Sequence, residues 1–219
     1  DNCYGIMVAR GDLGVEIEAE KIPRIQKELV AKCVSRLKPV IIATQMMKSM
    51  VNHPRPTRAE VNDVANAIYD GTDAIMLSEE TALGNYPTET VEMMTKIAIE
   101  SEVHGQNRGI TADELPITPA NVLAASAISA ARKLEANSII IDTNKGRTPR
   151  TMAAFRTRRP IHCRCYDKHV MRHLALSHGI HTDYMTIRES TDEFIDYALQ
   201  RMIDKDRVKQ DELVVVVAG

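Results

Sequence analysis

The stretch Ile6-Met7-Val8-Ala9-Arg10-Gly11-Asp12 joins a short apolar run directly to charged side chains. The same arrangement returns at Val40-Ile41-Ile42-Ala43-Thr44-Gln45 and again at Ala74-Ile75-Met76-Leu77-Ser78-Glu79-Glu80, so the repeat is regular. A run of apolar residues of this length is typical of a strand buried on both faces of a parallel sheet. The repeat therefore predicts three consecutive β/α units, with strands at 6–9, 40–43 and 74–77.

Helical sequence follows each of these strands. Apolar residues recur at close to helical spacing over 20–36, 57–69 and 88–102. Parallel β/α units place the carboxyl ends of their strands at one rim, where a (β/α)8 barrel carries its active site. We therefore expect a partial (β/α)8 TIM barrel. Because three units cannot close eight strands, we also expect the chain to be part of a longer polypeptide.

The second half of the chain begins after a segment without periodicity, residues 103–118, which we interpret as a linker. Beyond it, helices and strands alternate again. Helices are expected at 119–134, 148–156, 167–177 and 190–204, and strands at 138–141, 161–165, 181–185 and 214–217. The alternation is most simply a doubly wound α/β sheet. We therefore divide the chain into domains at 1–103 and 104–219, the second incomplete at its end.

The composition excludes several classes of protein. With 44% apolar and 26% charged residues, the 219-residue chain is not disordered, collagen-like or a coiled-coil rod. Its net charge of −2 argues against a nucleic-acid partner. We find neither an apolar stretch long enough to span a membrane nor a leader sequence. We therefore expect no membrane partner and a cytoplasmic protein with free thiols.

Positive charge is concentrated in residues 145–172, which carry nine lysines and arginines against one acid. Such a basic island suggests a small anionic ligand, although a solvated face or a subunit contact would carry the same charge. The segment also places Cys163 and Cys165 on one face of a predicted strand. Three histidines are near them in the sequence: His162, His169 and His173. The spacing departs from the C-x₂-C of zinc sites, so a metal cluster is a weak alternative here.

The ends of the first two predicted strands carry candidate chemistry. Gly11 lets the backbone approach a ligand closely, and Asp12 offers a hard oxygen ligand of the kind that Mg²⁺ prefers. Arg10 could clamp a phosphate, or could pair with Asp12 in a tight turn. Thr44 could hydrogen-bond a substrate or relay a proton, or could cap a helix.

Two further stretches are candidates for the same rim. The loop Pro54-Arg55-Pro56-Thr57-Arg58-Ala59-Glu60 is fixed by two prolines, and Thr57 and Glu60 fit a capping box. It is either a rigid loop near the active rim or a helix entry with a subunit salt bridge. Glu79 and Glu80 follow the third strand. A buried acid there could bind substrate or change a neighbour's pKa, whereas exposed acids would favour the next helix N-terminus.

Taken together, these stretches resemble the pyruvate kinase family. Five motifs match it in order and spacing: IMVARGDLGVE at 6–16, KPVIIATQM at 38–46, PRPTRAE at 54–60, DVANA at 63–67 and IMLS at 75–78. Motifs of this length are specific. The resemblance is close over about 1–100 and looser after that. It implies that 1–103 is the end of a catalytic TIM barrel, its last three β/α units. It also implies that 104–219 is most of a C-terminal regulatory domain.

The resemblance implies a glycolytic enzyme that transfers the phosphoryl group of phosphoenolpyruvate to ADP, giving pyruvate and ATP. It implies that Asp12 ligates Mg²⁺ or Mn²⁺ and that Thr44 assists proton transfer to the enolate. The implied catalytic residues are Thr44, Arg10 and Ser78, and the implied substrate-binding residues are Ala9, Arg10, Gly11, Asp12 and Thr44. The family's catalytic lysine, its glutamate metal ligand and the residues of its K⁺ site are not in this chain. We therefore expect the 219 residues alone to be inactive. Glu79 stands where the family usually has glycine.

A second implied site is the stretch Asp142-Thr143-Asn144-Lys145-Gly146-Arg147-Thr148, which resembles the family's effector phosphate loop. A strand end, a glycine turn and a helix start bind anions through backbone N–H groups. The basic island suggests the same ligand independently. The candidate residues are Thr143, Asn144, Lys145, Gly146, Arg147 and Thr148. Lys145-Gly146 replaces the family's usual Ser-Gly, which leaves the identity of the sugar-phosphate effector open. The family also implies a homotetramer.

Two other functions stay open at this point. One is a Mg²⁺-dependent barrel lyase that acts on pyruvate or its enolate, although the 54–60 loop and the second α/β domain argue against it. The other is a non-catalytic module, residues 104–219, that binds a sugar phosphate. Binding without turnover would favour this second alternative.

Overall fold

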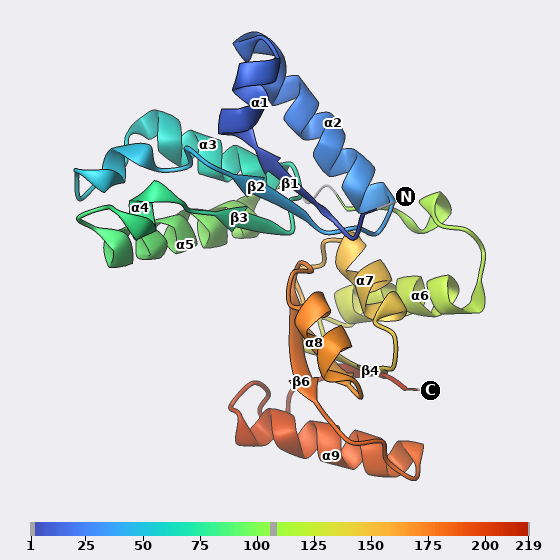
Figure 1. Ribbon diagram of the computed structural model, residues 1–219. Helices are drawn as coiled ribbons and strands as arrows, with labels where there is room; N and C mark the ends of the chain where they lie inside the picture. Colours follow the sequence, from blue (N-terminus) through green and yellow to red (C-terminus); the bar gives the residue numbers. More distant parts are fainter. Residues whose placement is uncertain (1–2, 106–108, 219) are drawn as a thin grey trace. The chain divides into compact units, whose positions relative to one another are not determined.

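The structure is a computed structural model that describes residues 3–105 and 109–218 (Figure 1). The chain divides into two compact units, residues 1–108 and 109–219. Each unit contains one parallel sheet. Part of the predicted 103–118 linker, residues 106–108, lies outside the described residues. Among those that are described, no helix is both long and apolar enough to cross a membrane.

The first unit is built on the three predicted strands. β1 (Ile6–Ala9), β2 (Val40–Ala43) and β3 (Ala74–Met76) pair in parallel in chain order, with Ala9 opposite Ala43 and Ala43 opposite Met76. The carboxyl ends of the strands therefore lie at one edge, as expected. The connecting helices are α1 (Arg10–Glu16), α2 (Ile22–Ser35), α3 (Arg58–Tyr69), α4 (Glu79–Ala82) and α5 (Pro87–His104), with 3₁₀ turns η1 (Ala19–Lys21) and η2 (Lys48–Val51).

The faces of this sheet are not buried equally. Val8 and Ile42 are buried, but Met7 is 51% exposed and its register partner Ile41 is only partly buried. The expectation of strands buried on both faces was therefore wrong for the face that carries Met7. In a closed barrel, side chains of the other strands fill the space against this face.

Two short helices were not predicted. Helix α1 begins at Arg10, directly after β1, where the sequence suggested a tight turn. Helix α4 occupies Glu79–Ala82 in the same position after β3. One or two helical turns are too short to show an apolar period, and Gly11 and Gly14 lower the helix propensity of the first.

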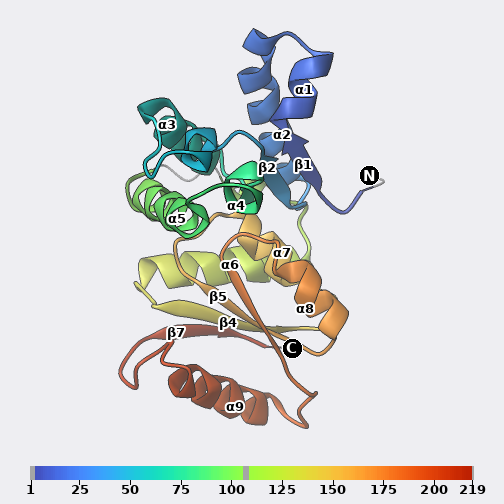
Figure 2. The ribbon, with the colours of Figure 1, turned by 60° about the vertical axis from the view of Figure 1, so that its left-hand side comes forward.

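The second unit is a doubly wound α/β sheet, which confirms the predicted class. Its strands β4 (Ser138–Thr143), β5 (Ile161–Cys165), β6 (Ile180–Tyr184) and β7 (Val214–Val217) are all parallel in the order β6-β5-β4-β7. Helix α9 (Thr191–Asp204) covers one face, as Figure 2 shows. The other face is covered by α6 (Pro119–Lys133), α7 (Arg147–Ala154) and α8 (Lys168–Leu174), and a 3₁₀ turn η3 (Ala112–Glu114) precedes α6.

The central strand β4 shows how the apolar pattern produces two cores. Ile139 and Ile141 are buried with Ala127, Met152 and other residues on the α6–α8 side. Ile140 points the opposite way and packs in the cluster that contains Phe194 of α9. A continuous apolar run is thus required because each face of the strand is covered by helices.

Candidate functional site

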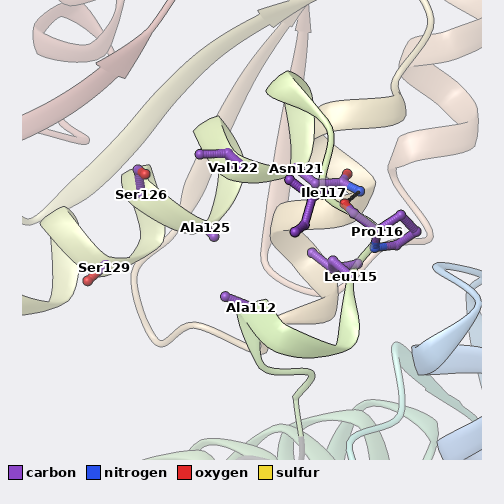
Figure 3. Close-up of a pocket in the computed structure, with 9 residues that line it drawn as sticks. All are labelled: Ala112, Leu115, Pro116, Ile117, Asn121, Val122, Ala125, Ser126 and Ser129. Carbon is purple, nitrogen blue, oxygen red and sulfur yellow. Dashed lines mark hydrogen bonds between the residues drawn. The ribbon is translucent and has the colours of Figure 1, made fainter.

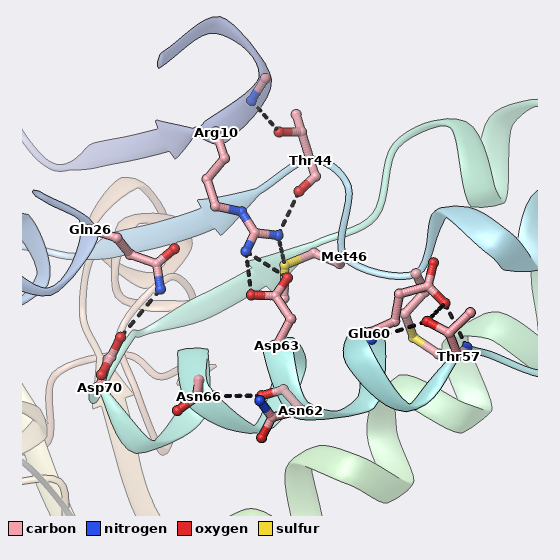
Figure 4. A network of polar contacts seen from close by, with 12 residues as sticks. Arg10, Gln26, Thr44, Met46, Thr57, Glu60, Asn62, Asp63, Asn66 and Asp70 are labelled. Atoms are coloured by element: carbon pink, nitrogen blue, oxygen red, sulfur yellow. Dashed lines mark hydrogen bonds and ion pairs between the residues drawn. The ribbon is translucent and has the colours of Figure 1, made fainter. Parts of the chain in front are cut away.

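Arg10 connects the ends of the first two strands (Figure 4). Its Nη1 lies 2.6 Å from both carboxylate oxygens of Asp63 on α3. Its Nη2 donates to the Thr44 carbonyl oxygen at 2.7 Å and contacts Met46 Sδ at 2.8 Å. The ion-pair partner of Arg10 is therefore Asp63, and not Asp12 as in the tight-turn alternative. Asp63 lies in the DVANA motif, but nothing in the sequence alone connected it with Arg10.

Thr44 has an unusual backbone conformation. Thr44 and Gln45 both have positive φ angles, 68° and 55°. A β-branched residue rarely adopts this region, and each such residue costs about 1–3 kcal/mol. Two hydrogen bonds hold Thr44 in place: Arg10 donates to its carbonyl, and the Gly11 N–H donates to its Oγ1 at 3.0 Å. Strain that neighbouring groups enforce is typical of functional positions.

Asp12 lies in the first turn of α1, and its side chain is exposed. Ala9 is the N-cap residue of the same helix and has an extended backbone. The structure thus places Ala9, Arg10, Gly11 and Asp12 on the strand end and first helical turn beside Thr44. Over residues 3–105 and 109–218, no group of three or more His, Cys, Asp and Glu side chains is placed to hold a metal ion.

Ser78 follows β3 and is exposed. The nearby Glu80 connects its backbone to that of Met47, which follows β2. Glu80 is buried, with one oxygen accepting from the Ser78 N–H at 2.9 Å and the other from the Met47 N–H at 3.0 Å. Glu79 is exposed and lies 3.8 Å from Lys48. Both acids lie in the first turn of α4, but they follow different expectations: Glu80 is buried and accepts hydrogen bonds from two loops, whereas Glu79 is exposed.

The 54–60 loop forms the predicted capping box. Thr57 Oγ1 accepts from the Glu60 N–H at 3.3 Å, and Glu60 accepts from the Thr57 N–H at 2.7 Å. Glu60 also accepts from the N–H of Ser49 in η2 at 2.7 Å. Burial raises the pKa of Glu60, but the hydrogen bonds from Ser49 and Thr57 outweigh burial and leave that pKa below its ordinary value. The C-terminal end of the loop is therefore fixed both to α3 and to η2.

The predicted anion loop lies between β4 and α7 in the second unit. Thr143 Oγ1 accepts from the Gly146 N–H at 2.9 Å, and Gly146 has a φ of +72° as the N-cap residue of α7. Arg150 donates to the carbonyls of Gly146 and Lys145, both at 3.1 Å, and so fixes the loop from inside the helix. The side chains of Asn144, Lys145 and Arg147 are exposed. The loop therefore presents two cations on a rigid turn.

Part of the basic island serves the interior of the second unit. Arg164 is 1% exposed and forms an ion pair with Asp183. Lys205 also contacts Asp183, at 2.5 Å, and Arg207 lies 3.7 Å from it. Burial raises the pKa of Asp183, but Lys205 and Arg164 outweigh burial and hold it below its ordinary value. The island suggested an anionic ligand, a solvated face or a subunit contact, but Arg164 is buried and paired with Asp183 instead.

Two histidines complete this charged group. The rings of His162 and His181 stack with centroids 5.2 Å apart, and Arg207 Nη1 lies 3.3 Å from His162 Nδ1. Burial, followed by the charges of His181, Arg207 and Arg164, lowers the pKa of His162 to about 4, although Asp183 acts in the opposite direction.

The cysteine and histidine side chains do not form the alternative metal cluster. Cys163 and Cys165 pack in the core on the α6–α8 side of β5, whereas His162 alternates to the opposite face and contacts Arg207. His169 and His173 do contact one another as expected for i,i+4 positions on a helix, with ring centroids 4.1 Å apart. The separation of the cysteines from His162 agrees with the cysteine spacing, which departs from the C-x₂-C of zinc sites.

A pocket of about 320 Å³ lies within the second unit (Figure 3). It is lined by η3, the segment after it and the first half of α6: Ala112, Leu115, Pro116, Ile117, Asn121, Val122, Ala125, Ser126 and Ser129. None of these side chains is ionisable. The pocket thus lacks the charged groups that phosphoryl transfer requires, and it is separate from the residues described above.

The family models that match this chain cover most of it. The pyruvate kinase barrel domain matches residues 1–91, and the pyruvate kinase alpha/beta domain matches residues 121–219. Pyruvate kinase from Bacillus licheniformis is 44% identical over 98% of this chain and 37% of its own length. Pyruvate kinase from Clostridium acetobutylicum is 45% identical over 98% of this chain and 46% of its own.

A solved structure agrees with the sequence relatives. The crystal structure of a pyruvate kinase from Cryptosporidium parvum superposes with a TM-score of 0.91 at 34% identity, covering 99% of this chain and 45% of that chain. The present chain therefore spans less than half the length of the relatives it matches. The parallel units of the first half are the part of a TIM barrel that the sequence predicted, and the second half is the family's α/β domain. The chain belongs to the pyruvate kinase family.

Proposed function

We propose that the protein containing this chain transfers the phosphoryl group of phosphoenolpyruvate to ADP, giving pyruvate and ATP in cytoplasmic glycolysis. The observation that carries the proposal is Thr44, a strained residue that Arg10 and Gly11 hold against the helical turn that carries the exposed Asp12. The reaction needs a metal ligand, a proton relay and donors for a carboxylate, and these residue types stand together here.

Asp12 is the residue of this chain that we assign to Mg²⁺ or Mn²⁺. Mg²⁺ is commonly held by one or two protein carboxylates together with substrate phosphates and water, so a single exposed aspartate fits such a site. The bound ion supplies charge neutralisation at the transferring group. We assign no residue of this chain to K⁺. Because the resemblance assigns the catalytic lysine and a glutamate metal ligand to residues that are not in this chain, we expect the 219 residues alone to be inactive.

Thr44 is well placed to move a proton. Its Oγ1 accepts a hydrogen bond from the Gly11 N–H, so the hydroxyl hydrogen points elsewhere and can be donated. We propose that the substrate carboxylate takes over the Gly11 N–H, together with backbone groups of Ala9 and Arg10, when it binds. This exchange would free Thr44 Oγ1 to relay a proton to the enolate. Ser78, exposed at the end of β3, would join this site through ordered water.

We propose that Arg10 helps to bind the substrate and to position Thr44. Its guanidinium is bound to Asp63, Thr44 and Met46, and its side chain is 11% exposed. Its cationic charge next to the strand ends favours an anionic substrate, while its contacts set the conformation of Thr44.

The second unit supports a regulatory role. We propose that the loop Thr143–Thr148 binds the phosphate of a sugar-phosphate effector, because it combines a rigid glycine turn, a helix start and two exposed cations.

We also propose that the protein forms a homotetramer. Large apolar side chains are exposed on α5 and α6, including Ile99 at 58% and Val122 at 53%, and exposed apolar helix faces favour subunit contacts.

The test is pyruvate formation from phosphoenolpyruvate, ADP, Mg²⁺ and K⁺ by the full polypeptide that contains this chain. Asp12→Asn should lower kcat/KM by at least about 10²-fold, because a metal ligand is lost. Glu16→Gln is the matched control, since Glu16 is an exposed acid on the same helix.

Thr44 gives an independent test of the same proposal. Thr44→Val should lower kcat by about 10²–10⁴-fold, the range of a proton-relay group, whereas Thr44→Ser should keep most of the activity. Equal activity of Thr44→Val and the unchanged protein would contradict the proposed relay. Phosphate binding without any pyruvate formation by the full polypeptide would favour the non-catalytic alternative.

A further inference from the structure

Cys163 and Cys165 lie side by side in the second unit. Their Sγ atoms are 3.7 Å apart on one face of β5, and both residues are 0% exposed. They pack in the core that includes Leu174 of α8, and both are free thiols. Neither takes part in the function proposed above. A pair of thiols in contact has chemistry that a single buried cysteine lacks, because one can donate a hydrogen bond to the other and both can join.

The two thiols are not equivalent. The hydrogen bond to Cys165 and burial raise the pKa of Cys163 well above its ordinary value. The same hydrogen bond, received from Cys163, lowers the pKa of Cys165, although burial acts in the opposite direction. Arg164 stands between them in the chain, and its charge acts to lower the pKa of both thiols. Either thiol can donate the hydrogen bond to the other, and the lowered pKa favours Cys165 as the first of the two to ionise.

Closing the pair requires a local change in the strand. Residues i and i+2 of a strand have Cα atoms about 6.6 Å apart, at the upper end of the range of about 4.4–6.8 Å that disulfides span, but their Cβ atoms point to the same side and are about as far apart, beyond the roughly 3.5–4.5 Å that a disulfide needs. Closing the bond must therefore draw the two residues together and bend the end of β5. A bond that bends its strand is more easily reduced than a relaxed structural disulfide.

The end of β5 is connected to the anion loop. Cys165 is the register partner of Thr143, whose Oγ1 accepts from the Gly146 N–H. Gly146 itself lies against α8, because a Cβ added to it would come within 3.1 Å of Val170 and 3.2 Å of Leu174. Val170 and Leu174 belong to the same core as the two cysteines. A bend at Cys165 thus acts on the loop both through β4 and through α8.

We propose that Cys163 and Cys165 form a reversible dithiol–disulfide pair whose oxidation weakens anion binding by the Thr143–Thr148 loop. The second part rests on the anion-binding function proposed for that loop. Oxidation needs a low-molecular-weight disulfide such as oxidised glutathione, and α8 must open locally to admit it. Helix α8 is short, and Leu174 is its one buried residue, so local opening is expected there.

Oxidation would take two thiol–disulfide exchange steps. The Cys165 thiolate attacks one sulfur of the small disulfide, forms a mixed disulfide and releases one small thiolate. Cys163 then loses its proton and attacks the Cys165 sulfur, which releases the second small thiol. Two protein thiols become one disulfide, and one small disulfide is reduced to two thiols.

The first experiment maps the thiols of the full protein. We would incubate the reduced protein with oxidised glutathione, block the remaining thiols by alkylation and locate the linked peptides by mass spectrometry. We expect a Cys163–Cys165 disulfide that dithiothreitol reverses. Cys165→Ser and Cys163→Ala should each abolish it, whereas Cys33→Ser, which removes a buried thiol of the first unit, should not. Stable glutathionylation without ring closure, or no reaction at all, would overturn the proposal.

The second experiment measures the affinity of the reduced and the oxidised protein, before alkylation, for inorganic phosphate by calorimetry. We expect oxidation to weaken phosphate binding at least about tenfold in the unchanged protein and to leave Cys165→Ser unaffected. Equal affinity of the oxidised and reduced forms would overturn the coupling. Absence of phosphate binding by the reduced protein would instead reject the anion-loop function and, with it, the coupling, while the thiol mapping would still decide whether the disulfide forms.

Discussion

The Arg10 guanidinium places one nitrogen, Nη1, at 2.6 Å from both carboxylate oxygens of Asp63, and so joins the end of β1 to α3. The arginine side chain is 11% exposed and the aspartate 35%. Hydrogen bonds to charged groups in such a partly buried position contribute more than exposed ion pairs do. The pair therefore stabilises the contact between two successive β/α units.

The first prediction concerns this ion pair. Asp63→Asn should lower the free energy of unfolding by about 1.5–3 kcal/mol, because a charged partner of Arg10 is lost. Glu28→Gln is the control: Glu28 pairs with Arg24 on the surface of α2, and its loss should cost at most about 0.5 kcal/mol. Urea unfolding of both variants measures the difference. Equal losses would contradict the assigned role of Asp63.

Adjacent acids give the second prediction. Glu80→Ala should lower the free energy of unfolding by about 2–4 kcal/mol, because the N–H groups of Met47 and Ser78 lose their acceptor. Glu79→Ala removes an exposed carboxylate and should change that free energy by no more than about 0.5 kcal/mol. Thermal unfolding of the two variants tests this contrast, and a similar shift in Tm for both would refute it.

The third prediction is a pH dependence of stability. The pKa of His162 is about 4 in the folded protein against 6.5 as its ordinary value, so the unfolded chain binds the proton more tightly. The stability that neutral His162 confers is fully present above pH 6.5 and is lost as the pH falls toward 4, by about 3 kcal/mol in total. The lowered pKa of Asp183 adds a loss in the same direction at lower pH.

Unfolding free energies at pH 7 and pH 5 would measure this effect. His162→Phe keeps a ring for stacking on His181 and should reduce the dependence between these two pH values, and the remainder comes from His181, whose pKa burial and Arg207 also lower. His53→Phe, at an exposed histidine of the first unit, should leave the dependence unchanged. A slope that persists unreduced in His162→Phe would show that other groups are responsible.

Two glycines with positive φ angles give the fourth prediction. Gly179→Ala should cost about 1–2 kcal/mol, since its φ is +67° but no heavy atom lies within 4 Å of an added Cβ. Gly146→Ala has the same backbone cost and also crowds Val170 and Leu174, which adds about 1–3 kcal/mol. Gly146→Ala should also weaken phosphate binding, and Gly179→Ala should not. Calorimetric titration with phosphate, beside thermal unfolding, distinguishes the two.

Local patterns in the sequence predicted the elements well. The three apolar runs became β1, β2 and β3, and the alternation after residue 118 became the doubly wound sheet. The capping box of Thr57 and Glu60 formed because all of its atoms lie within one helical turn. Such signals are readable because the interacting residues are neighbours in the chain.

The candidate site was only partly predictable, because its interacting residues are far apart in the chain. The partners Asp63 of Arg10 and Met47 of Glu80 come from other units of the repeat, and no local spacing indicates such pairs. The positive φ of Thr44 likewise has no signal in the sequence, since threonine is a poor residue for that conformation. Motif resemblance singled out these stretches of chain, but the contacts between them depend on how the units pack.

The backbone of Thr44 has a consequence for folding as well as for chemistry. Its conformation is unfavourable by itself and is held by donors that belong to the preceding β/α unit, Arg10 and Gly11. A chain in which these two units have not yet docked would leave Thr44 to relax into an ordinary extended or helical conformation. The arrangement that we propose for catalysis would therefore form at the same step as the tertiary contact, and a misassembled protein would lack it even with every residue present.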